Sequence, residues 1–255
     1  MLTYDVVIPV KPLIDAKTRL SPAVDPTARA ALARAFALDT ITAALAAPRV
    51  ARVVVVGDLS GHLDELPDGV VVVAEPEPRS LASAVRHGIA EARRTSTPEP
   101  SDASGRSHRG IAVLLGDLPA LTAAALGAAL DAASRHPLAF MPDSDGTGTT
   151  LATAGAHTRL EPAFGTDSAA RHRALGFRDL SHEVPAQLAR FVRRDVDTVE
   201  ALDGALRLGV GTHTAEAVAE FADGALGRSR PEAGAQAIRS ENTTASLDST
   251  RKGAA

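Results

Sequence analysis

Residues 142–150 have a composition suited to binding an anion rather than to filling a core. Gly146 and Gly148 alternate with hydroxyl residues, directly after the apolar run 138–141. A glycine-rich main chain can approach an anion closely and direct several N–H groups at it, and threonine hydroxyls add donors. We therefore expect a cradle for a phosphate or carboxylate at the end of a strand, with a plain polar loop as the alternative. No Gly-Lys-Ser/Thr follows, so the stretch is not a P-loop.

Three cations, Lys11, Lys17 and Arg19, follow the apolar run 5–10. In an α/β sheet, a nucleotide binds beyond the carboxyl ends of buried strands. Arginine can grip a phosphate bidentately and lysine supplies a mobile charge, so this loop is a candidate triphosphate site. The alternative is a solvated loop whose cations only maintain solubility.

Acidic residues follow two other apolar runs. Asp117 comes just after residues 111–115, and Asp195 and Asp197 come after Phe191 and Val192. A carboxylate at a strand end can help to hold Mg²⁺, which one or two carboxylates bind together with substrate phosphates. The alternatives are a turn residue for Asp117 and a helix N-cap for Asp197.

A second anion-binding pattern lies at Gly165, where small hydroxyl residues precede a predicted helix. The start of a helix presents unpaired N–H groups and the positive end of its dipole. Asp167 could instead simply cap that helix. His172, one turn further on, could face the site or the solvent.

These candidate residues need a framework that places them together. Valine-rich runs alternate with Ala/Leu-rich stretches, which predicts a parallel sheet covered by helices on both faces. The helix at 27–47 has Asp25 or Thr27 near its cap and Pro26 close to its start. We expect further strands at 52–58, 70–73, 111–115 and 137–141, and further helices at 80–94, 122–135 and 198–208.

Composition limits the classes of function. The chain has 255 residues, 45% of them hydrophobic, with six Phe, one Tyr, no Trp and no Cys. A net charge of −4 and so few aromatic residues argue against nucleic-acid binding. No thiolate metal site or disulfide is possible. We see neither a signal peptide nor a run of membrane-spanning length, and expect a cytoplasmic protein.

The domain organisation follows from composition along the chain. We expect one nucleotide-binding domain over residues 1–224, within which the Ser/Pro/Arg-rich segment 95–109 forms a surface loop. Residues 225–255 have almost no large apolar side chains, which is typical of a disordered tail. The sequence does not indicate an oligomeric state.

Four pieces of the sequence, in this order, resemble one family. They are the loop from Val10 to Leu20, the turn Gly116-Asp117-Leu118-Pro119, the run 142–150, and the block that contains Phe164, Gly165, Ser168 and His172. Together they look like the 2-phospho-L-lactate guanylyltransferases, whose actinobacterial members are phosphoenolpyruvate guanylyltransferases of coenzyme F(420) biosynthesis. The resemblance runs from about residue 4 to 210. The first two pieces are shared with other nucleotidyltransferases.

The resemblance implies an α/β fold, a three-layer Rossmann-like nucleotidyltransferase domain of the GT-A type with a mostly parallel sheet. It implies GTP, Mg²⁺ and a small phosphorylated acid: phosphoenolpyruvate, 2-phospholactate or 3-phosphoglycerate. Asp117 and Asp197 would bind the metal, and Lys17 and Arg19 would meet the GTP phosphates and act in catalysis with Asp117. The implied acid-binding residues are Thr150, Gly165 and Ser168, with Thr149 and Gly148 beside them, and the implied nucleotide-binding residues are Val10, Lys11, Lys17, Arg19 and Ser83.

One departure from the family concerns the nucleotide base. The family often carries Gly-Leu-Asn before the helix beside the base pocket, where this chain has Ser80-Leu81-Ala82. Ala82 lacks the amide of Asn, which Ser83 would partly replace. The alternatives are a molybdenum-cofactor-type or sugar-phosphate nucleotidyltransferase, a sugar transferase on the same sheet, or a non-catalytic nucleotide-binding protein.

Overall fold

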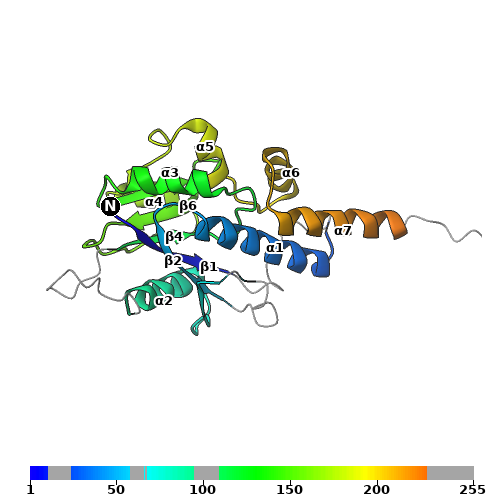
Figure 1. Cartoon of the computed structure of the whole chain (residues 1–255), viewed down its shortest axis with the longest axis horizontal. Coiled ribbons are helices and arrows are strands. Elements are labelled where there is room, and N and C mark those ends of the chain that lie inside the picture. The colour runs from blue at the N-terminus through cyan, green and yellow to red at the C-terminus, as the bar shows by residue number, and fades with distance from the viewer. Residues whose placement is uncertain (11–23, 58–65, 67, 95–108, 229–255) are drawn as a thin grey trace, which may run out of the picture.

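The computed structural model describes residues 1–10, 24–57, 66, 68–94 and 109–228, which form a mixed α/β fold (Figure 1). Lys11, Lys17 and Arg19 lie outside the described residues, as do residues 95–108 and 229–255. The elements, in chain order, are β1 (Tyr4–Pro9), α1 (Pro26–Leu45), β2 (Val50–Val56), β3 (Val70–Val73), α2 (Leu81–Arg94), β4 (Gly110–Leu114), α3 (Ala123–Ala133), β5 (Leu138–Pro142), β6 (Thr149–Ala154), α4 (Ser168–Ala174), β7 (Arg178–Asp179), α5 (Ala186–Val192), α6 (Val199–Leu208) and α7 (Thr212–Arg228).

The sheet of the described chain has the strand order β3-β2-β1-β4-β6-β5-β7. Strands β1 to β4 pair in parallel, with Val6 opposite both Val53 and Ala112, as the valine-rich runs predict. Strand β6 is antiparallel to both of its neighbours, β4 and β5. The sheet is therefore mostly parallel, and β6 is a strand that the sequence analysis missed.

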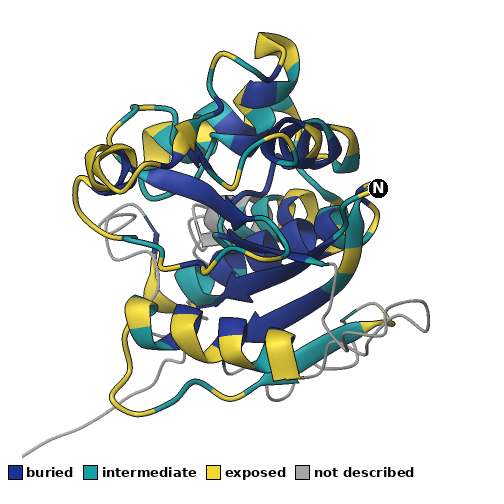
Figure 2. Ribbon diagram, turned by 90° about the vertical axis from the view of Figure 1, so that its left-hand side faces the viewer, coloured by how far each residue is buried: buried dark blue, intermediate teal, exposed yellow. Residues whose placement is uncertain are grey.

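Helices cover both faces of the sheet, so the domain has three layers. Alternating residues of β1 point to opposite faces: Val6 and Ile8 belong to the core under α1 and α3, and Val7 belongs to the core under α2. In Figure 1, α1 and α3 lie on one side of the strands and α2 on the other. Figure 2 shows the buried strands between helices whose outer faces are exposed.

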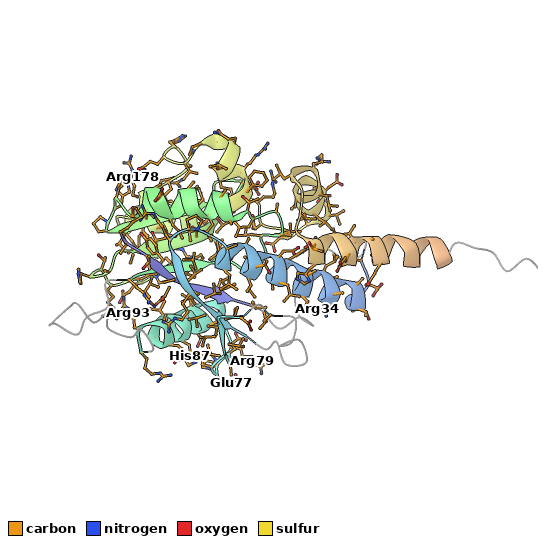
Figure 3. All side chains as sticks on the ribbon, in the orientation of Figure 1. Arg34, Glu77, Arg79, His87, Arg93 and Arg178 are labelled. Carbon is orange, nitrogen blue, oxygen red and sulfur yellow. The ribbon has the colours of Figure 1, made fainter. Side chains whose placement is uncertain are left out.

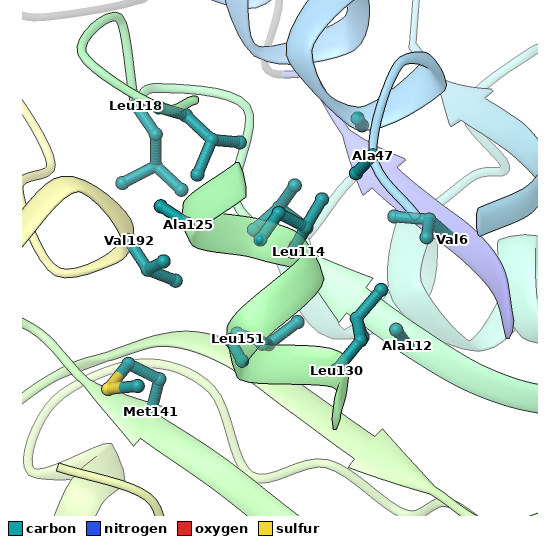
Figure 4. Close-up of a cluster of buried hydrophobic side chains, with 14 of the residues drawn as sticks. Val6, Ala47, Ala112, Leu114, Leu118, Ala125, Leu130, Met141, Leu151 and Val192 are labelled. Atoms are coloured by element: carbon teal, nitrogen blue, oxygen red, sulfur yellow. The ribbon is translucent and has the colours of Figure 1, made fainter. Parts of the chain in front are cut away.

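The larger core joins the strands that carry the candidate site residues. Leu114 of β4, Leu151 of β6 and Met141 of β5 are fully buried with Leu130 of α3 (Figure 4). Burying such a side chain contributes about 1.5–3 kcal/mol. This packing fixes the three strand ends relative to one another.

The carboxyl ends of the parallel strands meet at one edge of the sheet. Since β6 is antiparallel to β4 and β5, β5 ends and β6 begins at this same edge. The Leu115 N–H donates to the Thr150 carbonyl over 2.9 Å, which ties the segment after β4 to the start of β6. The segments after β1, β4 and β5 are therefore neighbours.

The charged side chains outside this edge lie mainly on the surface. Arg79, Glu77 and Arg178, labelled in Figure 3, have side chains that are 59%, 75% and 61% exposed. Ion pairs at such positions contribute little to stability. No helix among the described residues has the length and apolar character needed to cross a bilayer.

Helix α7 is attached to the domain through a buried carboxylate. Asp39 of α1 accepts hydrogen bonds from the N–H groups of His213 and Thr214, over 3.1 and 2.9 Å. The Gly211 N–H donates to the Pro119 carbonyl. Phe221 and Val218 of α7 then pack on Leu32 and Phe36 of α1. The helix ends at Arg228, four residues beyond the expected domain boundary at 224.

We predict that Asp39→Ala lowers the free energy of unfolding by about 2 kcal/mol, because it leaves two N–H groups at the start of α7 without an acceptor. Urea unfolding followed by circular dichroism measures the change. Asp203→Ala, which removes an exposed partner of Arg207, serves as the control and stays within about 0.5 kcal/mol of wild type. Equal effects of the two substitutions would contradict the role assigned to Asp39.

Candidate active site

A cavity of about 430 Å³ lies at the edge where the strand ends meet. Its walls come from the ends of β1 and β4, the turn between β5 and β6, the loop before α4, and the segment that joins α5 to α6. The cavity therefore unites segments that are far apart in the sequence.

Most of the predicted site residues within the described chain line this cavity. They are Val10, Asp117, Gly148, Thr149, Gly165, Ser168 and Asp197. Thr150 and Ser83 do not line it. Thr150 is fully buried, with its hydroxyl 3.4 Å from the Met141 carbonyl, and the Ser83 N–H donates to the Ser80 hydroxyl at the start of α2. Three of the four predicted pieces, those that contain Asp117, Gly148 and Gly165, thus meet at this cavity. Of the remaining piece, the loop from Val10 to Leu20, the structure describes only Val10, which also lines the cavity.

The β5–β6 turn corrects one expectation. The Asp143 carboxylate accepts hydrogen bonds from the N–H groups of Thr147 and Gly148, over 3.0 and 2.8 Å. The main-chain carbonyl of Asp143 accepts one from the Gly146 N–H. The expected cradle of free main-chain donors is therefore wrong for residues 146–148, because the turn uses these donors itself. A Cβ at Gly148 would overlap the Asp143 carboxylate, so a larger residue here would displace that carboxylate from the two N–H groups.

Arg193 holds the same turn from outside, a role that sequence reasoning missed. Its guanidinium donates to the carbonyl of Asp143 over 2.7 and 3.0 Å and to that of Pro142 over 3.2 Å. Arg193 is the residue at the end of α5, two positions before Asp195. It therefore fixes the turn to the segment that carries the acids.

The loop before α4 retains main-chain donors that face the cavity. Gly165 and Asp167 have φ angles of 113° and 54°, and Asp167 makes no side-chain cap bond, contrary to its alternative reading as a cap. The Ser168 N–H donates to the Gly165 carbonyl. Within the described residues, the N–H groups of Gly165, Thr166 and Asp167 have no hydrogen-bond acceptor. An anion at this point of the cavity can take them.

Five aspartates line the cavity: Asp167 in the loop before α4, and a cluster formed by Asp117, Asp143, Asp195 and Asp197. Burial raises the pKa of Asp195 to about 7, and repulsion from the other three aspartates of this cluster adds to the shift. Asp197 is not the cap of α6, since Thr198 accepts the Ala201 N–H there. Asp197 instead contributes to the lining of the cavity.

The paired acids fit a hard divalent cation. The Val196 N–H donates to the Asp117 carbonyl over 3.1 Å, which sets Asp195 and Asp197 beside Asp117. Within the described residues, no three His, Cys, Asp or Glu side chains are arranged to hold a metal by themselves. Mg²⁺ needs only one or two carboxylates when water and substrate phosphates complete its shell. Asp117 and Asp197 meet that requirement.

His172 faces neither the solvent nor the cavity, so both expected placements are wrong. It is fully buried and stacks on Phe140, with Phe164 and Phe177 edge-on. Its Nδ1 lies 3.0 Å from the Thr149 hydroxyl, and its Nε2 accepts the Ala163 N–H over 3.0 Å. Burial lowers the pKa of His172 to about 4. The ring is therefore neutral at physiological pH.

We predict that His172 makes stability depend on pH between about 6.5 and 4. The folded protein keeps the ring neutral down to about pH 4, while the unfolded chain binds a proton near pH 6.5. The unfolded state therefore binds more protons in this range, and acidification lowers the free energy of unfolding. The contribution of His172 falls by about 3 kcal/mol across the range.

The measurement is the difference in the free energy of unfolding between wild type and His172→Asn at pH 7 and pH 4. A difference is needed because the raised pKa of Asp195 acts in the opposite direction over part of this range. The stability advantage of wild type shrinks on acidification. A difference that stays constant with pH would contradict the neutral, buried state of His172.

Comparisons with known proteins agree with this arrangement. A family model described as "Guanylyl transferase CofC like" matches residues 4–222. The phosphoenolpyruvate guanylyltransferases of Streptomyces coelicolor and Geodermatophilus obscurus are each 44% identical to this chain; the alignments cover 86% and 83% of it, and 98% and 92% of those proteins.

A solved structure is similar in fold. It is that of a putative nucleotide-diphospho-sugar transferase from Desulfovibrio desulfuricans, with a TM-score of 0.58 and 18% identity over 88% of this chain and 96% of that one. At this identity the likeness concerns the fold alone, and it confirms the expected Rossmann-like α/β class. The match over residues 4–222 decides the family: the chain belongs to the CofC-like guanylyl transferases, which are nucleotidyltransferases.

Proposed function

We propose that this protein transfers GMP from GTP to phosphoenolpyruvate and releases pyrophosphate, giving enolpyruvyl-2-diphospho-5'-guanosine for coenzyme F(420) biosynthesis. The observation that carries the proposal is that Asp117 and Asp197 line the same cavity as Gly165 and Ser168. The activity named for relatives that are 44% identical over most of the chain supports the choice of reaction.

The reaction needs positioning and charge neutralisation more than proton transfer. A phosphate oxygen of the acid attacks the α-phosphorus of GTP, the bond to the β-phosphate oxygen breaks, and pyrophosphate leaves. The attacking phosphate monoester is largely ionised at neutral pH, so no general base is required. The main obstacle is repulsion between two anions, which the site lowers by holding them in line and neutralising their charge.

Asp117 and Asp197 are the residues that would hold Mg²⁺. Burial, together with repulsion from Asp117, Asp197 and Asp143, raises the pKa of Asp195 to about 7, and such a cluster of acids fits a site that holds a divalent cation when it is active. When bound, the ion would supply positive charge between the phosphate groups of the two substrates. Lys17 and Arg19, outside the described residues, are proposed to bind the leaving pyrophosphate.

The acid is proposed to bind between β6 and the loop before α4. The N–H groups of Gly165, Thr166 and Asp167 and the Ser168 hydroxyl offer donors without mobile charge. On the other wall of the cavity, Thr149 adds a hydroxyl, whereas the hydroxyl of Thr150 contacts the Met141 carbonyl. We therefore give Thr149, rather than Thr150, the side-chain contact with the acid.

The nucleotide is proposed to occupy the side of the cavity lined by Val10, Ala33 and Leu81. These side chains are apolar and can contact a base and ribose. Because the Ser83 side chain does not line the cavity, recognition of guanine through Ser83 requires a rearrangement at the start of α2.

Incubation with GTP, Mg²⁺ and each of the three candidate acids tests the function, with the product identified by mass spectrometry and pyrophosphate measured in parallel. We expect the diphosphate adduct with phosphoenolpyruvate. Asp117→Asn, which conserves size, abolishes turnover because it removes a metal-binding charge. Asp145→Asn, at an exposed acid of the β5–β6 turn outside the cavity lining, is the matched control and keeps wild-type activity.

The proposed function would be refuted if wild type formed no adduct with any of the acids. Full activity of Asp117→Asn would refute the metal assignment alone. Thermal unfolding of both variants shows whether the fold is retained.

Ser168→Ala is predicted to raise the KM for the acid about tenfold or more, because one hydrogen bond to an anion is lost. The KM for GTP changes much less. Ser134→Ala, whose hydroxyl bonds the Asp131 carbonyl on the surface, is the control and changes neither constant. Equal increases in the two KM values would count against a contact between Ser168 and the acid.

A further inference from the structure

We propose that His172 is a positioning residue that directs the hydroxyl hydrogen of Thr149 toward the acid. This inference rests on the function proposed above. It starts from a histidine that is buried outside the cavity and yet bonds to both of the segments that form the acid-binding walls.

The hydrogen bonds of His172 define its tautomer. Nε2 accepts the main-chain N–H of Ala163, so it carries no hydrogen. A neutral imidazole has one ring hydrogen, which must then be on Nδ1. Nδ1–H therefore donates, and its acceptors are the Thr149 hydroxyl oxygen, 3.0 Å away, and the Ser168 carbonyl one turn earlier in α4.

This assignment fixes the direction of the hydrogen bonds that the Thr149 hydroxyl makes. Because the hydroxyl oxygen accepts from His172, its own hydrogen cannot point at the ring and must be given to another acceptor. Thr149 lines the cavity, where an anionic acid would supply that acceptor. The chain of donors thus runs from Ala163 N–H to His172, from His172 to Thr149, and from Thr149 to the acid. Donation by His172 also strengthens the hydroxyl as a donor, since linked hydrogen bonds polarise one another.

The ring cannot readily turn to the opposite arrangement. Phe140 stacks on it with centroids 5.4 Å apart, and Phe177 and Phe164 contact it edge-on at 4.8 and 5.5 Å. A flipped ring would also put a ring C–H where Nε2 now lies. The Ala163 N–H would then lose its acceptor, which is costly in a buried site. The aromatic contacts therefore keep both nitrogens on their partners.

The same ring sets the spacing between the two walls of the acid site. It joins Thr149, at the start of β6, to Ala163, two residues before Gly165. A second link, from the Ala169 N–H to the Thr147 carbonyl over 3.0 Å, crosses the same gap. His172 therefore controls both the direction of one donor and the distance between the two groups of donors.

Two substitutions separate the two hydrogen bonds of the ring. In His172→Asn, the side-chain NH₂ takes the place of Nδ1–H and retains donation to Thr149. In His172→Gln, the side-chain oxygen takes the place of Nε2 and retains the bond from Ala163 only. We expect the KM for phosphoenolpyruvate to rise about tenfold in His172→Gln, the size of one lost charge-assisted bond, and less in His172→Asn. The KM for GTP stays unchanged in both variants.

His136→Asn is the matched control, because His136 bonds Glu183 and neither residue lines the cavity. A double-mutant cycle with Thr149→Val gives the sharper test. If His172 acts through the Thr149 hydroxyl, His172→Gln adds little to the KM for the acid once Thr149 is valine. Additive effects, or equal rises in both KM values, would overturn the proposal.

Nitrogen NMR of the wild-type protein labelled at histidine provides a readout that needs neither a variant nor turnover. We expect a neutral His172 ring at pH 7 with hydrogen on Nδ1 and a bare Nε2. The opposite tautomer would overturn the inference. A wild-type protein that forms no adduct, while its ring has the expected tautomer, would instead place the failure in the proposed function.

Discussion

Crowding of negative charge is the constraint on which the site depends. Asp117, Asp143, Asp195 and Asp197 cluster at one cavity, to whose lining Asp167 adds a fifth carboxylate. Asp143 is satisfied by two N–H groups of its own turn. Burial, with repulsion from its acidic neighbours, raises the pKa of Asp195 to about 7, and Asp117 and Asp197 are the proposed ligands of a cation. Such an arrangement is unfavourable for an empty protein but suits a reaction in which positive charge must be concentrated between two anionic substrates.

The antiparallel strand β6 makes that concentration possible. It lies between β4 and β5, so the turn that precedes it reaches the edge where β1 and β4 end. Arg193 then holds the turn from the side of the acids, and His172 holds it from the side of the loop before α4. The two walls of the cavity are thus supported by side chains outside it, which is how a binding geometry is kept accurate.

The sequence predicted the framework because buried parallel strands are continuous apolar runs, and β1, β3 and β4 lie within one residue of their expected positions. It also placed Asp117, Asp197, Gly165 and Ser168 in one site.

The sequence analysis missed β6, because the glycines before Thr149 favoured a loop, although the threonine-rich run 149–154 was a usable strand signal. Side chains alternate along a strand, so the choice between Thr149 and Thr150 required the register. His172 was a candidate whose position was misplaced, and Arg193 gave no signal, since the roles of both depend on contacts with distant segments.

The turn between β5 and β6 is complete without a ligand. Asp143 accepts from the N–H groups of residues 146–148, Arg193 donates to the carbonyls of Pro142 and Asp143, and the absence of a Cβ at Gly148 leaves room for the Asp143 carboxylate. A bound ligand therefore does not have to order this turn, and its binding free energy contains no entropy cost for doing so. Divergence toward another acid within such a scaffold would proceed by exchanging single side chains around a rigid hairpin, and insertions in the hairpin itself would be selected against.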